Sequence, residues 1–200
     1  PLLHLRMENT PGKPCPFLTG QGCGVYEDRS AACRTYPLGR ATMPAPALEK
    51  EASDSPDTGE IPLVEQYFLV REGHCHGFAG QRSWTIQSWL GDQGINQYNS
   101  MNDRYRRLIS RYKSVADGAV LSEKHATLAL LCLYQQDRFL DFIKSVDLFS
   151  RVRFTGDLAE LNREECIRML ENDSEQRLLF AFDWMELVLF GSSSRVAPFA

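Results

Sequence analysis

The sequence predicts a mainly α-helical protein: an irregular, cysteine-rich N-terminal segment with at most a few short strands, followed by a helical, bundle-like region. Three observations predict this class. Residues 1–40 contain closely spaced Gly and Pro and no sustained hydrophobic period, which indicates turns and short elements. From about Ser83 onward, apolar residues recur at the three- and four-residue spacings of an amphipathic helix. Four of the six cysteines precede residue 80, namely Cys15, Cys23, Cys33 and Cys75.

The elements expected in the first eighty residues are short. Asp28 to Thr35 predicts two helical turns with Asp28 as the N-cap. Residues 40–60 hold Pro, Ser and acidic residues and few large apolar ones, so we expect an exposed, mobile loop. Ile61–Val70 is dense in branched and aromatic residues and predicts a half-buried strand. A turn at residues 73–80 then carries Cys75.

Helices are expected over most of the remaining chain. Asn162 with Glu165 three residues later predicts a capping box at one helix start. The expected helices are Ser83 to about Gly91, Ile95–Val115, a long one from Leu121-Ser122 through Val146, and two that flank the polar break at 172–174. We therefore divide the chain into a partial metal-binding domain, residues 1–80, and a helical region, residues 81–200, that packs on it.

The composition excludes several classes of protein. Hydrophobic residues make up 43% and charged residues 24%, which is typical of a globular domain rather than a disordered chain. The net charge of −4 gives no general attraction to nucleic acid, and we expect the basic stripe of Arg104, Arg107 and Arg111 to be a solvated helix face. The longest apolar run, Leu128–Tyr134, is too short to cross a membrane. No signal peptide is visible, and we expect a cytoplasmic protein.

The cysteine spacing points to metal ligation without deciding it. Cys15 and Cys23 are separated by seven residues, Cys23 and Cys33 by nine, and Cys75 follows after forty-one more. Thiolate is a soft ligand that suits zinc and iron–sulfur centres, and four thiolates complete a tetrahedral shell. No pair has the two-residue gap of a zinc knuckle, so four free thiols in a reducing cytosol remain an alternative. A disulfide framework is disfavoured in that compartment.

The residues around these cysteines resemble a known family. CPFL at 15–18, CGVYEDR at 23–29 and ACRTYP at 32–37 are similar to the second half of the YkgJ-type cysteine-cluster family, the CxxCxxCC zinc- or iron-chelating domains. HCHGF at 74–78 resembles the later cysteine of that pattern. The likeness covers about residues 13–80, and the helical half resembles no family. It implies that Cys15, Cys23, Cys33 and Cys75 bind one or more metals, either zinc or iron, with an iron–sulfur cluster as one form of the iron.

Two departures from the family pattern bear on this expectation. Ser30 stands where the family has proline after the arginine. The CxxCxxCC cluster itself is absent from the sequence. Because the chain opens on Pro1 rather than Met, we expect that cluster to precede Pro1 and to share its metal with the cysteines seen here. Without those partners, an empty site is one expected outcome.

The neighbouring residues have simpler interpretations. His74 and His76 are either additional ligands or solvated side chains. Arg34 is expected to donate to a metal thiolate, to pair with Glu27, or to be a surface arginine. A local core around the cysteines is expected from Phe17, Tyr26 and Tyr36. The two remaining cysteines, Cys132 and Cys166, lie on apolar helix faces and are expected to be small core residues.

Three functions follow from these observations. The first is a metal-chelating bacterial protein, with zinc or an iron–sulfur cluster held by cysteine thiolates. The second is a cluster-supported enzyme related to flagellin lysine N-methylases or iron–sulfur oxidoreductases, although no nucleotide-binding or methyl-donor motif is present. The third is a module in which metal stabilises the fold and the helices bind a protein partner.

Overall fold

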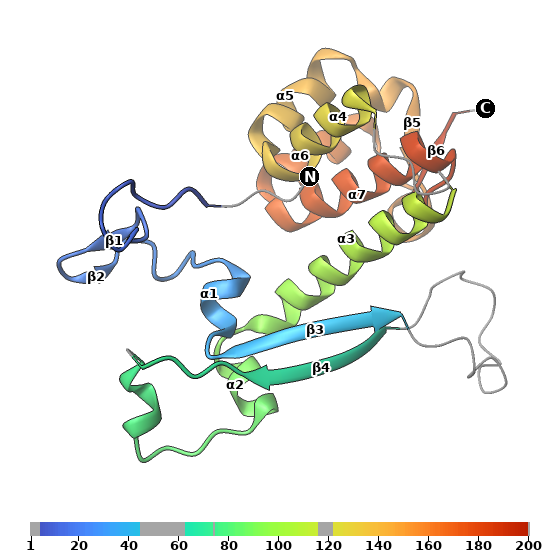
Figure 1. The fold of residues 1–200 in the computed structure, drawn as a ribbon. Helices are drawn as coiled ribbons and strands as arrows, with labels where there is room; N and C mark the ends of the chain where they lie inside the picture. Colours follow the sequence, from blue (N-terminus) through green and yellow to red (C-terminus); the bar gives the residue numbers. More distant parts are fainter. Residues whose placement is uncertain (1–4, 45–62, 74, 116–121, 200) are drawn as a thin grey trace, which may run out of the picture. The chain divides into compact units, whose positions relative to one another are not determined.

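The computed structural model describes residues 5–44, 63–73, 75–115 and 122–199 and shows a mainly α-helical chain, as predicted (Figure 1). In these residues seven α-helices accompany three two-stranded antiparallel sheets. The chain divides into two compact units, Pro1–Asp103 (unit 1) and Arg104–Ala200 (unit 2). The domain boundary expected at residue 80 stays a prediction. None of the described helices is long and apolar enough to span a membrane.

Unit 1 consists of short elements. They are β1 (Leu18–Thr19), β2 (Gly22–Cys23), α1 (Ala31–Thr35), β3 (Leu38–Pro44), β4 (Leu63–Leu69), a 3₁₀ turn η2 (His76–Ala79), α2 (Ile86–Asp92) and the first part of α3 (Ile95–Val115). β1 pairs with β2, and β3 pairs with β4 from Leu38↔Leu69 to Pro44↔Leu63. The long helix predicted at 95–115 is confirmed by α3. The strand predicted at 61–70 is confirmed by β4 over its described residues, but it is mostly exposed rather than half-buried, since Phe68 and Leu69 are 54% and 49% exposed.

Hydrogen bonds made by Arg40 and Tyr67 connect the β3–β4 ribbon to α3. Arg40 lies opposite Tyr67 in the ribbon, and its guanidinium donates to both carboxylate oxygens of Asp103 at 2.7 Å. It also pairs with Glu65 at 2.5 Å. Tyr67 accepts a hydrogen bond from Asn99 on α3 at 3.1 Å. The Arg40 side chain is only 10% exposed, so this bidentate pair replaces part of the apolar contact that a short ribbon would otherwise need.

Two predictions for this unit are wrong. Residues 40–44 belong to β3 rather than to a mobile loop, because they alternate against β4; the other residues of that predicted loop, 45–60, lie outside the described part. Helix α1 begins at Ala31 after Ser30, not after Asp28. The backbone N–H of Asp28 instead closes a turn on the Val25 carbonyl at 3.0 Å.

Helix α2 also begins later than predicted. It starts at Ile86 rather than Ser83, because Thr85 accepts a hydrogen bond from the Ser88 N–H while the Ser88 hydroxyl accepts from the Thr85 N–H. This reciprocal pair is a capping box with Ser in place of the usual Glu. The capping residue, Thr85, therefore lies two residues downstream of the predicted start.

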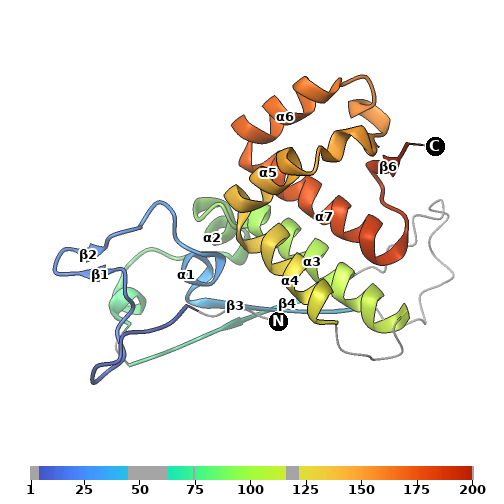
Figure 2. The ribbon, with the colours of Figure 1, turned by 90° about the horizontal axis from the view of Figure 1, so that it is seen from above.

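Unit 2 is a helical assembly around α7. Its elements are the second part of α3, α4 (Glu123–Tyr134), α5 (Gln136–Ser145), η3 (Leu148–Ser150), β5 (Val152–Phe154), η4 (Gly156–Leu158), α6 (Arg163–Asn172), α7 (Ser174–Phe190) and β6 (Val196–Pro198). Helix α7 contacts α4, α5, α6 and β6, and Figure 2 shows α4, α5 and α6 grouped with it. It is therefore the central helix of the unit.

The long helix predicted from 121 through 146 is divided in two. Gln135, with φ −118° and ψ 58°, leaves the helical region and separates α4 from α5. The predicted apolar face survives the break, since Cys132, Phe139 and Ile143 are all buried. Periodicity therefore identified the buried face correctly and missed the bend.

The start of α6 is confirmed. The Asn162 side chain accepts from the Glu165 N–H at 3.0 Å, and the Glu165 carboxylate accepts from the Asn162 N–H at 2.9 Å. At the predicted polar break, Asp173 caps α7 by accepting from the N–H groups of Glu175 and Gln176. Two local capping motifs thus set both helix starts.

Aromatic rings form the centre of unit 2. The Phe180 ring on α7 lies 5.3 Å from Phe149, 5.4 Å from Phe154 and 6.1 Å from Phe139, measured between ring centroids. All four side chains are buried. Each ring brings a large apolar area and a favourable edge or offset contact, so this cluster is the principal source of hydrophobic stabilisation in the unit.

A buried carboxylate lies on the same helix. Asp183 is 0% exposed, and its Oδ1 accepts from Arg104 Nη2 at 2.6 Å while Oδ2 accepts from Arg195 Nε at 2.8 Å. The hydroxyls of Ser193 and Ser194 also donate to Oδ1. One member of the predicted basic stripe, Arg104, is therefore used in an internal ion pair rather than presented to solvent.

Asp183→Asn should destabilise unit 2 strongly. The amide removes the charge that balances Arg104 and Arg195, and removal of one partner from a buried pair costs about 3 kcal/mol or more. We expect a clear fall in the urea midpoint of the far-ultraviolet circular dichroism signal. Asp137→Asn is the matched control, because that side chain is 99% exposed and should change stability by less than about 0.5 kcal/mol. Equal midpoints for the two variants would contradict the assignment.

Candidate metal site

The four predicted ligands lie on three segments of unit 1. Cys15 and Cys23 belong to the two arms of the β1–β2 hairpin, Cys33 lies in α1, and Cys75 immediately precedes η2. All four are free thiols; Cys23 and Cys33 are exposed, and Cys15 and Cys75 are half-buried. Their chemistry fits a soft metal ion, because sulfur is the donor type that zinc and iron–sulfur centres prefer.

Their positions do not form a ready metal centre. Within the described residues, no group of three or more His, Cys, Asp or Glu side chains is close enough together to hold a metal ion. His74 lies outside the described residues, and His76, at the start of η2, is exposed. The structure therefore supplies the donor atoms of the predicted site without assembling them.

Arg34, next to Cys33, organises the loop between Cys23 and Cys33. Its guanidinium donates to the main-chain carbonyls of Glu27, Arg29 (3.1 Å) and Gln93 (3.3 Å). The Arg34 side chain thus binds the Glu27 backbone rather than its carboxylate. Three carbonyls on one planar fork fix the loop to the turn between α2 and α3.

Arg29 reinforces the same attachment. Its Nε donates to the Tyr26 carbonyl at 2.9 Å, its Nη2 donates to the Gln93 side chain at 3.2 Å, and its guanidinium stacks on the Tyr26 ring at 3.7 Å. Gln93 therefore accepts hydrogen bonds from both arginines: its side chain accepts from Arg29 and its main-chain carbonyl accepts from Arg34. No motif in the sequence marks Gln93, since its role depends on where the chain returns after fifty-nine residues.

Two further contacts attach α1 to its surroundings. The indole Nε1 of Trp89 on α2 donates to the Thr35 carbonyl at 3.0 Å. The Tyr36 hydroxyl donates to the Glu72 carboxylate at 3.0 Å, and the Cys75 N–H donates to the Glu72 carbonyl at 3.0 Å. The Cys75 side chain, with burial and Glu72 as smaller causes, raises the pKa of the Tyr36 phenol well above its usual value. Cys33, within α1, and Cys75, three residues after Glu72, therefore lie in segments that the Tyr36–Glu72 bond connects.

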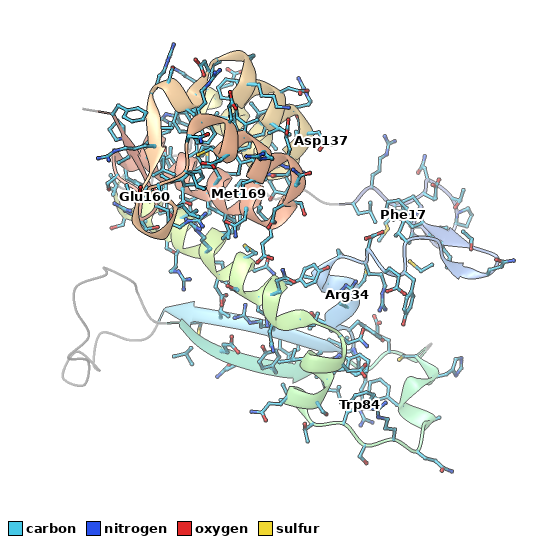
Figure 3. The ribbon with its side chains drawn as sticks, turned by 180° about the vertical axis from the view of Figure 1, so that it is seen from behind. Phe17, Arg34, Trp84, Asp137, Glu160 and Met169 are labelled. Atoms are coloured by element: carbon cyan, nitrogen blue, oxygen red, sulfur yellow. The ribbon has the colours of Figure 1, made fainter. Side chains whose placement is uncertain are left out.

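The predicted aromatic core around the cysteines is wrong for two of its three members. Phe17 is 44% exposed and Tyr26 is 55% exposed, and only Tyr36 contacts one of the cysteines. Figure 3 shows Phe17 on the β1–β2 hairpin, Arg34 on α1 and Trp84 ahead of α2. Hydrophobic residues with no partner element in reach stay exposed, so the cysteine segment is held by polar contacts instead.

The other two cysteines have the role that the sequence predicted. Cys132 and Cys166 are buried in unit 2, and burial raises the pKa of their thiols to about 12 and about 11. Both are therefore protonated at neutral pH and behave as small apolar core residues.

Trp89→Phe should loosen α1. The variant leaves the part-buried Thr35 carbonyl without its donor, a loss of about 1 kcal/mol. The amides of Arg34 and Tyr36, which donate to Ser30 and Ala32, should then exchange about fivefold faster with deuterium. Trp84→Phe is the control, because the Trp84 ring meets Trp89 edge-on but makes no bond to α1. Unchanged exchange in Trp89→Phe would contradict the inference that the Trp89–Thr35 hydrogen bond stabilises α1.

No family model, curated protein or solved structure matches the chain. The site is therefore defined by its own residues and their geometry.

Proposed function

We propose that this chain is a metal-chelating protein of the YkgJ-type cysteine-cluster kind, in which the thiolates of Cys15, Cys23, Cys33 and Cys75 bind zinc or iron. One observation carries the proposal. Three of the free thiols, Cys15, Cys23 and Cys33, lie in residues 5–34, and Cys75 lies in residues 71–89; neither range includes a buried side chain among its described residues. Thiols with no role in packing, placed on segments with no core, are suited to ligation.

The physical argument concerns the folding of such a segment. Fixing each residue costs roughly 1–2 kcal/mol of conformational entropy, which buried apolar area normally offsets. In unit 1 the only buried large apolar side chains among the described residues are Leu90 and Ile95. A metal ion that joins distant thiolates offsets the same cost with a few strong bonds. Metal binding would thus complete a unit that hydrophobic packing leaves weak.

The proposal includes a reducing compartment, the cytoplasm, because only thiols that are not in disulfides bind metal. Zinc and an iron–sulfur cluster are both compatible with four thiolate ligands. The positions described above require the cysteine segments to converge before either metal is fully ligated.

A second candidate function is supported by a different surface. On the β3–β4 ribbon, the face that carries Gly39 and Phe68 also carries the exposed side chains of Met43 and Val64. An exposed apolar ribbon face is typical of a surface that binds another protein. This feature favours the interpretation of a module that binds a protein partner, with metal as a structural element.

Full chain purified under anaerobic, reducing conditions should contain metal bound in an amount stoichiometric with protein. Cys23→Ser and Cys33→Ser should each lose more than half of the bound metal, because each variant lacks one thiolate ligand. Both thiols are exposed, so the substitution should not disturb packing. Atomic emission and acid-labile sulfide assays measure the content. Zinc without sulfide indicates a mononuclear thiolate site, and iron with sulfide indicates a cluster.

Cys166→Ala is the matched control for that experiment. Its thiol is buried in unit 2, so metal content should equal that of the wild type. Wild-type protein without metal, or equal content in all three variants, would contradict the ligand assignment.

A further inference from the structure

The hairpin segment, which we define as residues 8–24, makes hydrogen bonds only within itself in the part of the chain that the structure describes. Gly24 donates to the Phe17 carbonyl at 2.8 Å, and Leu18 donates to the Cys15 carbonyl at 3.0 Å. The Thr19 side chain bonds Gly22 across the turn. No ion pair or ring contact links the segment to the rest of the described residues. It is thus a small folded element attached through the chain alone.

Apolar packing does not hold the hairpin segment either. Its strands are two residues long, and Phe17 and Leu18 are 44% and 61% exposed. An isolated two-stranded hairpin is marginal in water. In Figures 1 and 2 the hairpin extends beyond α1, on the side away from β3 and β4.

The other two cysteines lie on a fixed base. Cys33 is in α1, which Arg34 and the Trp89–Thr35 bond attach to α2 and to the turn after it. Cys75 is connected to the end of α1 through Glu72, whose carbonyl accepts from the Cys75 N–H at 3.0 Å and whose carboxylate accepts from the Tyr36 hydroxyl at 3.0 Å. We call Cys33 and Cys75 the anchored cysteines. They provide only two thiolates, whereas structural zinc takes four ligands.

We propose that metal binding docks the hairpin segment onto the anchored cysteines. In this arrangement Cys33 and Cys75 supply the fixed half of the site, and Cys15 and Cys23 supply the half that moves. The inference rests on the function proposed above, and it explains why the donors are present but not assembled. Each thiol that binds loses its proton to solvent as its sulfur–metal bond forms.

The connection between the two halves is long enough for this movement. Tyr26 is the first residue after the hairpin segment that the arginine attachments hold, through the bond from Arg29 to its carbonyl. The three residues from Cys23 to Tyr26 span up to ~10 Å when extended. The hairpin can therefore swing as a body while the Arg29 and Arg34 attachments stay in place.

Hydrogen–deuterium exchange on the reduced full chain, with and without Zn²⁺, tests the docking. Zinc should slow exchange of the amides in residues 15–24 by about tenfold or more. Cys23→Ser should abolish this protection. Cys33→Ser and Cys75→Ser should abolish it as well, although both lie outside the hairpin segment. Cys166→Ala should keep it, and the helical circular dichroism of unit 2 should be the same in every variant.

The outcomes separate docking from chelation. Zinc bound with no change in hairpin exchange, or with protection that survives both Cys33→Ser and Cys75→Ser, overturns docking and leaves chelation standing. A wild-type chain that binds no zinc overturns both. Deuterium exchange of α1 in metal-free Cys75→Ser shows whether this substitution disturbs α1 itself. If it does, the docking proposal is judged on Cys33→Ser alone, because that variant changes only an exposed thiol.

Discussion

Unit 1 is constrained by a shortage of buried apolar side chains, and its structure depends on a few polar contacts that act across long stretches of sequence. Arg40 joins the β3–β4 ribbon to Asp103, and Arg34 joins the cysteine loop to the carbonyl of Gln93. The indole of Trp89 joins α2 to α1. Each of these donors binds an acceptor more than fifty residues away, so a few bonds replace the cohesion that a hydrophobic core gives to most domains.

Unit 2 shows the opposite balance, and the comparison explains where the functional chemistry lies. Phe180 and its aromatic neighbours fill the interior, and the one fully buried charge among the described residues, Asp183, is neutralised by two arginines. Its two cysteines are protonated core residues. Because unit 2 already has a packed core, a metal ion would add little to its folding stability. In unit 1, which has exposed thiols and few buried side chains, a metal ion would add much more.

Local sequence signals predicted the helices, whereas the contacts between segments that are distant in the chain could not be predicted from the sequence. Helical period gave α3 and the buried face of α4 and α5, and Asn162 with Glu165 gave the start of α6. The bend at Gln135 carries no proline or glycine to mark it. The cysteines and their neighbours identified a candidate site, but Gln93, Glu72 and Trp89 were missed because their roles appear only after folding.

The exposed apolar residues of the hairpin segment and its unassembled thiols have one physical origin. A hairpin with two-residue strands cannot bury Phe17 or Leu18 against itself, and it makes no bond to α1 that would hold it there. Within the described residues, Cys15 and Cys23 also belong to no group of three or more side chains that could hold a metal ion. In the docking that we propose, a bridging ion would remove both deficiencies at once, because docking the thiolates would also bring Phe17 and Leu18 toward the base that carries Cys33 and Cys75. In such a unit, ligand binding and the completion of folding are one event.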